Sequence, residues 1–178
     1  KNFSTYGFSI FPNKISKTSS NNLFQTLNFF CNFFCPKVFN KKYKDKWLDK
    51  EFSNHLIYLR KENKNVFAAI YNSVARSSIL YNFCYENNLH TLAARILNTN
   101  INFLGIRDPI LRMDVPFDKR NIYGWHQDSA YTDLHVNPKN ELVFWIPLIK
   151  TTKKNGTLLV KLKSHYQKEN VSVLKKKV

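Results

Sequence analysis

"LFQTLNFFCNFFC", residues 23–35, is the most apolar stretch of the sequence, and it predicts a core helix. Four of its apolar residues recur at helical spacing: Leu23, Leu27, Phe30 and Phe34. The preceding "SKTSSNN" offers N-cap residues, and Pro36 stops the helix. The stretch is interrupted by polar residues and is shorter than the roughly 18 residues of a membrane span. It therefore indicates a buried helix of a folded domain.

The residues around this stretch predict further helices and one early strand. "YGFSIFPNKIS" (6–16) alternates apolar and polar residues and predicts a strand followed by a turn. A second helix is expected from about Lys46. Its apolar face comprises Leu48, Phe52, Leu56 and Leu59. Two more helices are expected within 65–98, with a break near "ENNLH" (86–90).

From residue 101 onward the pattern changes from helices to strands. "LRMDV" (111–115), "ELVFWIPL" (141–148) and "GTLLVKL" (156–162) are short, rich in β-formers and separated by turn residues, and Asn155-Gly156 predicts a hairpin. The expected fold class is α+β, with N-terminal helices packed on an antiparallel barrel or jelly roll. One domain is expected over residues 1–178, helical over about 16–98 and strand-rich over about 101–165.

The net charge of +16 invites a nucleic-acid partner, but the composition has a simpler explanation. Lys far outnumbers Arg, Asn and Phe are frequent and Gly is scarce, as an AT-rich coding bias would produce. Base recognition also favours Arg. We therefore expect a solvated basic surface, with neither nucleic acid nor membrane as partner.

The three cysteines form no CxxC pair and predict buried thiols in a reducing, cytoplasmic compartment.

"YGWHQDSAY" (123–131) carries the candidate metal site. On a strand, residues i and i+2 point to the same face, so His126 and Asp128 would present a nitrogen and a carboxylate oxygen to one ion. Two such ligands and a further histidine make the facial triad of non-haem Fe(II) oxygenases. The spacing alone also fits a polar surface loop.

"WHQDSAY" followed by "ELVFWIPLIKTTKKNGTLLVKLKSH" (141–165) resembles the phytanoyl-CoA dioxygenase family of Fe(II)/2-oxoglutarate-dependent oxygenases. In that family an HQD-type motif precedes a strand ending in Trp-Ile-Pro-Leu, a Thr-rich Asn-Gly turn and a strand leading to Ser-His. The opening "YGFSIFPNKIS" is also similar to the family's N-terminal strand. The resemblance implies a double-stranded β-helix, the cupin-like jelly roll, behind the helices.

Carried over residue by residue, the resemblance implies that His126 and Asp128 are Fe(II) ligands. Gln127 and Trp145 match positions that line the 2-oxoglutarate pocket, and Met113 matches another more loosely. Trp145 and Met113 also fit plain core residues. A carboxylate at 128 implies hydroxylation, since related halogenases replace it with a small residue.

The family pattern continues beyond the residues present here. It places a third histidine ligand and a 2-oxoglutarate-binding arginine downstream of the Ser-His turn, whereas this chain ends at Val178 and has no Arg after Arg120. The resemblance therefore implies missing C-terminal strands and an open sheet edge, which a second copy would cover. The third ligand would come from His135, His165, water or a partner chain. His165 matches a turn that is usually structural, with Lys163 where Gly is common.

Two functions follow from these observations. The first is a dioxygenase that hydroxylates a small organic or acyl substrate with Fe(II) and 2-oxoglutarate. The second is a non-catalytic remnant that binds an anion or a partner through its basic surface.

Overall fold

The computed structural model describes residues 2–43, 46–116, 118, 123–128 and 141–166. The chain divides into two compact units. The helical unit comprises Asn13–Phe117 and Pro147–Lys150. The second unit comprises Lys1–Pro12, Asp118–Ile146 and Thr151–Val178.

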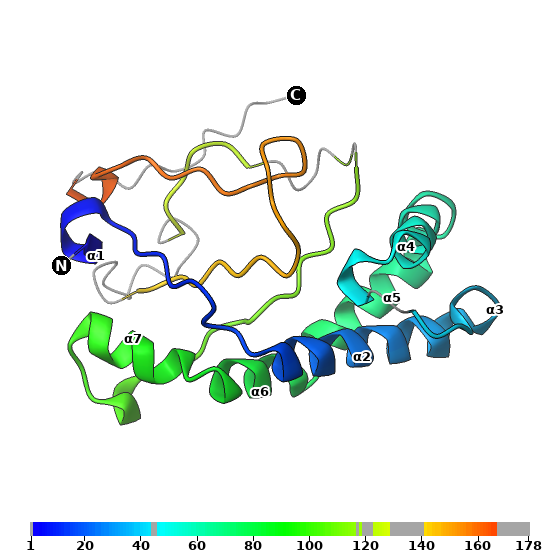
Figure 1. Cartoon of the computed structure of the whole chain (residues 1–178), viewed down its shortest axis with the longest axis horizontal. Coiled ribbons are helices and arrows are strands. Elements are labelled where there is room, and N and C mark those ends of the chain that lie inside the picture. Colours follow the sequence, from blue (N-terminus) through cyan, green and yellow to red (C-terminus); the bar gives the residue numbers. More distant parts are fainter. Residues whose placement is uncertain (1, 44–45, 117, 119–122, 129–140, 167–178) are drawn as a thin grey trace. The chain divides into compact units, whose positions relative to one another are not determined.

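The helical unit contains the expected helices. Figure 1 shows them along the chain: α2 (Lys17–Phe34), α3 (Pro36–Phe39), η1 (Lys46–Leu48), α4 (Lys50–Glu62), α5 (Lys64–Ala75), α6 (Ile79–Glu86), α7 (Leu89–Leu97) and η2 (Ile101–Phe103). Where two helices were expected over 65–98, the structure has three. The helical region is interrupted at Asn87–Asn88, as predicted, and also after Ala75.

Helix α2 begins and ends where the sequence predicts. The Ser16 hydroxyl accepts a hydrogen bond from the Ser19 amide at 3.0 Å, which satisfies one of the free N–H groups of the first turn. The helix ends at Phe34, and Pro36 opens α3, where its missing N–H costs nothing. Helix α2 packs against α3, α5 and α6, so it forms the centre of the helical unit.

The core lies between α2, α3, α4 and α5. Each fully buried Leu, Ile or Phe contributes roughly 1.5–3 kcal/mol to stability. The fully buried cluster consists of Phe24, Leu27, Cys31, Phe39, Phe52, Leu59, Phe67, Ile70 and Val74. In addition, the rings of Phe24 and Phe52 lie 4.9 Å apart. The predicted apolar face of the second helix is thus confirmed for Phe52, Leu56 and Leu59, whereas Leu48 is 69% exposed and belongs to η1, before α4 begins at Lys50.

The α+β jelly roll is not what the structure shows, because the described residues contain helices and irregular segments but no strand. The expected early strand is preceded by helix α1 (Asn2–Tyr6), and residues 8–11 are irregular. The predicted double-stranded β-helix is therefore wrong for this part of the chain. The described residues also contain no open sheet edge that a second copy could cover.

Residues 111–115 show why alternation misled the strand prediction. Leu111, Met113 and Val115 pack against the helical core, while Arg112 and Asp114 point outward and pair at 3.1 Å. The segment has the two-residue period of a half-buried strand, but helices cover its apolar side. Period-2 patterning thus marks an extended chain with one buried face and does not require a neighbouring strand.

The predicted turn at Asn155-Gly156 forms, but its flanking strands do not pair. The Thr157 amide donates to the Thr152 carbonyl at 3.1 Å, and Gly156 has φ 89°, which glycine tolerates best. Beyond the turn, Leu158, Leu159 and Leu162 are exposed.

Within the described ranges, no helix is both long and apolar enough to cross a membrane.

Candidate functional site

His126 and Asp128 meet, although not on a strand. Residues 123–127 form a loop, so the predicted strand is wrong at this point. The side chains nevertheless converge, with His126 Nε2 3.2 Å from Asp128 Oδ1. The other ring nitrogen, Nδ1, lies 2.7 Å from the Gly124 carbonyl oxygen. The loop therefore achieves the convergence that strand geometry was expected to provide.

The hydrogen-bond pattern determines which imidazole nitrogen faces the carboxylate. Because the Gly124 carbonyl can only accept, His126 Nδ1 carries a proton and donates it. Metal-binding histidines commonly donate their second ring N–H to a backbone carbonyl in this way, which orients the ring. Two donors that bind neighbouring positions of one ion at about 2.1 Å lie roughly 3 Å apart. The pair thus fits two positions on one transition-metal ion.

Among the described residues, no third protein ligand is brought to this pair. Within the described residues, no group of three or more His, Cys, Asp or Glu side chains is arranged to hold a metal. His165 has a structural role instead, because its Nε2 lies 3.0 Å from the Ser4 carbonyl oxygen. Its ring also packs on Gly7, where an added Cβ would lie 2.5 Å from Nδ1. His135 lies outside the described residues.

The turn that carries His165 has a left-handed residue at Lys163. Lys163 stands where the family commonly has Gly, and it adopts φ 61°, the left-handed region that favours glycine. Its amide donates to the Tyr6 carbonyl at 3.1 Å, and the Tyr166 hydroxyl donates to Ser4 at 2.6 Å. These bonds tie η6 (Ser164–Tyr166) to α1 within the second unit.

The residues expected to line the 2-oxoglutarate pocket are distributed over both units. Gln127 lies between the two candidate ligands, and its amide reaches the Ser164 carbonyl at 3.5 Å, the long limit of a hydrogen bond. Trp145 belongs to the same unit and is 41% exposed. Met113 packs against the helical core, as its alternative reading as a core residue predicted.

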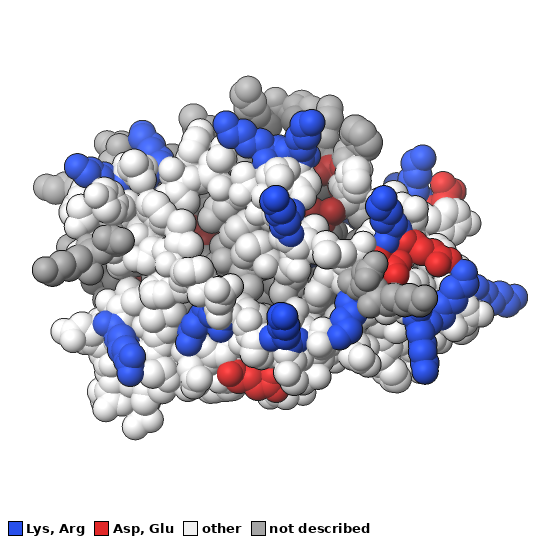
Figure 2. All heavy atoms as spheres, viewed as in Figure 1, with Lys and Arg blue, Asp and Glu red and all other residues white. Residues whose placement is uncertain are grey.

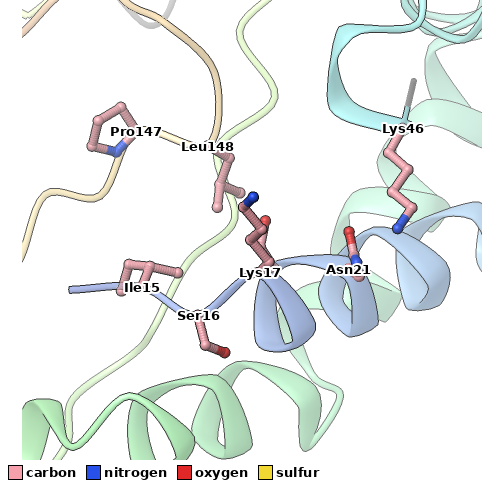
Figure 3. Close-up of a pocket in the computed structure, with 8 residues that line it drawn as sticks. Ile15, Ser16, Lys17, Asn21, Lys46, Pro147 and Leu148 are labelled. Carbon is pink, nitrogen blue, oxygen red and sulfur yellow. The ribbon is translucent and has the colours of Figure 1, made fainter. Parts of the chain in front are cut away.

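The helical unit contains an open hollow that sequence reasoning missed. Its volume is about 500 Å³, and Lys17 and Lys46 contribute basic side chains to it. In Figure 3, Lys46 extends toward Asn21 on α2. The remaining lining residues are Ile15, Ser16, Ser20, Pro147 and Leu148. Only the net charge hinted at such a site, because Lys17 and Lys46 lie far apart in the sequence.

Basic residues do not gather into one patch on the face shown in Figure 2. Lys and Arg side chains are scattered there among uncharged residues. A protein that binds a phosphate backbone usually presents a continuous basic stripe. The side of the molecule drawn in Figure 2 shows no such stripe among the described residues.

No protein-family model, curated protein or solved structure matches this chain. The resemblance to the phytanoyl-CoA dioxygenase family therefore rests on the motifs in residues 123–165 and on the similar opening segment.

Proposed function

We propose that this chain is an Fe(II)/2-oxoglutarate-dependent oxygenase that hydroxylates a small organic or acyl substrate. One observation carries the proposal. His126 Nε2 and Asp128 Oδ1 lie 3.2 Å apart, and the ring is oriented by the Gly124 carbonyl. A reducing compartment would keep both Fe(II) and the three free thiols reduced.

Each residue of the loop has a separate task in this proposal. His126 and Asp128 hold the metal through one nitrogen and one oxygen, the mixed donor set that non-haem Fe(II) prefers. Bound Fe(II) would supply oxygen activation, with 2-oxoglutarate as the co-reductant. By the resemblance, Gln127 and Trp145 line the cosubstrate pocket. The third ligand would be His135, water or a partner chain, since His165 would first have to give up its bond to Ser4.

Metal binding by this pair can be measured without activity. Titration of the chain with Mn(II), followed by electron paramagnetic resonance, should give weak binding, because two protein ligands hold a metal less tightly than three. His126→Ala and Asp128→Asn should each weaken binding at least tenfold. Asp108→Asn is the matched control, because Asp108 is an exposed carboxylate beside Arg107. Equal affinities for the chain and all three variants would contradict the proposal.

Cosubstrate turnover is the second test. Succinate formation from 2-oxoglutarate with Fe(II) and O₂ should depend on His126 and Asp128 and should be low. Suppose that the chain binds the metal but forms no succinate with any substrate tried. His126 and Asp128 would then form a metal site without oxygenase activity. That result would contradict the proposed reaction.

The lysine-bearing hollow favours anion binding as a second candidate function. No acidic residue lies in the first turn of α2, and Lys17 adds positive charge to the positive end of the helix dipole. An anion between Lys17 and Lys46 would offset both charges. Because Trp47 Nε1 donates to the Ser20 hydroxyl at 2.9 Å, Trp47 fluorescence should respond to inorganic phosphate. Lys46→Ser should abolish the response and the exposed Lys37→Ser should not.

A further inference from the structure

Helix α1 is capped by residues that lie far from it in the sequence. The last carbonyl groups of a helix have no partner within the helix itself. The Ser4 carbonyl accepts from His165 Nε2 at 3.0 Å and from the Tyr166 hydroxyl at 2.6 Å. The Tyr6 carbonyl accepts from the Lys163 amide at 3.1 Å. We call these three hydrogen bonds the α1–η6 clasp, and they hold η6 beside the end of α1 (Figure 1).

Gly7 lets the clasp close at short range. It has φ 85°, the left-handed conformation that ends many helices. A Cβ atom at this position would lie 2.5 Å from His165 Nδ1, so the absence of a side chain leaves the space that the imidazole ring occupies. The position of the His165 ring therefore depends on the residue at position 7.

The clasp also contacts the loop that carries the candidate metal ligands. Gln127 lies between His126 and Asp128, and its side-chain amide donates to the carbonyl of Ser164, the first residue of η6, at 3.5 Å. A hydrogen bond of this length is weak, so it orients the loop only if Ser164 is itself held in place. Among the described residues of the second unit, none is fully buried. Hydrogen bonds therefore have a larger share in holding this loop than apolar packing has.

We propose that the α1–η6 clasp positions the loop of His126 and Asp128, with His165 and Tyr166 as positioning residues. The inference rests on the proposed metal site and adds helix α1 to its support. Two ligands serve one ion only while their donor atoms stay close together, as the 3.2 Å between His126 Nε2 and Asp128 Oδ1 allows. Releasing η6 from α1 would free Gln127 and let the two donor atoms separate.

Nuclear magnetic resonance of the ¹⁵N-labelled full chain tests the positioning without any metal. With the imidazole neutral at about pH 8.5, the His126 proton should reside on Nδ1, which faces the Gly124 carbonyl. In His165→Ala the released ring should exchange between both tautomers. His165→Gln keeps an N–H that can donate to Ser4 and should restore much of the parent signal. The spectrum of His126→Ala assigns the resonance, and an unchanged tautomer in His165→Ala would overturn the proposal.

Mn(II) titration followed by electron paramagnetic resonance measures the effect on the metal site. His165→Ala and Gly7→Ala should weaken binding about tenfold, because each removes or displaces the imidazole of the clasp. Tyr166→Phe removes one hydroxyl donor and should weaken binding about threefold. Tyr58→Phe is the matched control, because Tyr58 is an exposed tyrosine on α4 in the helical unit, and it should leave the affinity unchanged.

Circular dichroism checks that the helices of every variant remain folded. Equal Mn(II) affinity in the parent and in His165→Ala would overturn the proposal, as would equal weakening by Tyr166→Phe and Tyr58→Phe. A parent chain that binds no Mn(II) would instead contradict the proposed metal site. In that case the tautomer of His126 in His165→Ala decides by itself whether the clasp positions the loop.

Discussion

Asn87 is the residue on which the contact between α2 and α6 most depends. Its side-chain oxygen accepts from the Ser16 amide at 2.8 Å, and its amide donates to the Ser19 hydroxyl at 2.8 Å and to the Phe83 carbonyl at 2.7 Å. The residue is buried, and all the hydrogen bonds of its amide lie inside the protein. Losing it leaves several polar groups unpaired at once.

Asn87→Ala should therefore destabilise the chain by roughly 2–4 kcal/mol, because it removes three hydrogen bonds and buries their former partners unpaired. Urea unfolding followed by circular dichroism measures the loss. Asn82→Ala on the exposed side of α6 is the control and should stay within about 0.5 kcal/mol of the parent. Equal losses in both variants would mean that the Asn87 bonds contribute nothing specific.

The thiol of Cys31 should make stability depend on pH. Burial, and secondarily the neighbouring Cys35, raises the pKa of Cys31 from 9.0 to about 12. Between these values the folded chain keeps a proton that the unfolded chain releases, so the free energy of unfolding falls as pH rises. We expect a loss of about 1 kcal/mol from pH 8 to pH 10 that Cys31→Ala lacks. If the free energy of unfolding changed with pH by the same amount in the parent and in Cys31→Ala, this prediction would be contradicted.

At the scale of elements, side-chain caps determine where the helices begin. Asp49 caps α4 by accepting from the Phe52 amide at 3.0 Å. Asn63 both ends α4 and caps α5, accepting from the Val66 amide at 3.2 Å. Ser78 precedes α6 but makes no capping bond. The chain thus contains the same residue type, serine, at one capped start (Ser16) and one uncapped start (Ser78).

This pair gives a direct test of capping. Ser16→Ala should cost about 1 kcal/mol, because it removes the acceptor for the Ser19 amide, whereas Ser78→Ala should change stability by only a few tenths. Both substitutions delete one hydroxyl from a helix N-cap, so urea unfolding compares them directly. A similar cost at both positions would show that the loss comes from general hydration of serine and not from the cap.

At the scale of the whole molecule, burial is concentrated in the helical unit. Every fully buried residue among those described lies between Ser19 and Ala94. Among the described residues of the second unit, hydrogen bonds join η6 to α1, while the side chains of Trp145 and Leu158 are exposed. The described segments of this unit have few buried apolar contacts, which implies low local stability for these segments.

Native-state hydrogen exchange should therefore separate the two units. Amides of α2 and α5 should exchange most slowly, near the rate set by global unfolding, and those of 156–162 should exchange orders of magnitude faster. Mass spectrometry of peptides from one sample provides both rates under identical conditions. Slow exchange across 141–148 and 156–162 would instead indicate strands that pair.

How much could be predicted from the sequence differs between the two halves of the chain. The helix over 23–34, its stop before Pro36 and the apolar face of α4 follow from a period of 3.6 and from local caps. The convergence of His126 with Asp128 was predicted for the wrong reason, since a loop produces it. The hollow that contains Lys17 and Lys46 and the hydrogen bonds of Asn87 both join residues far apart in the sequence. No local sequence pattern predicts them.

The sequence by itself determined helices α2 and α4, the Asn155-Gly156 turn and the candidate pair at His126 and Asp128, because caps, turns and helical periodicity act over a few residues. Only the tertiary structure decided what covers the extended segments. The alternation of apolar and polar residues at 111–115 requires one buried face. A sheet or a layer of helices can bury that face with a similar gain in free energy, since the hydrophobic effect is non-directional. Strand pairing depends on backbone groups of a distant segment coming within hydrogen-bonding distance. Here Leu111, Met113 and Val115 meet the helical core instead.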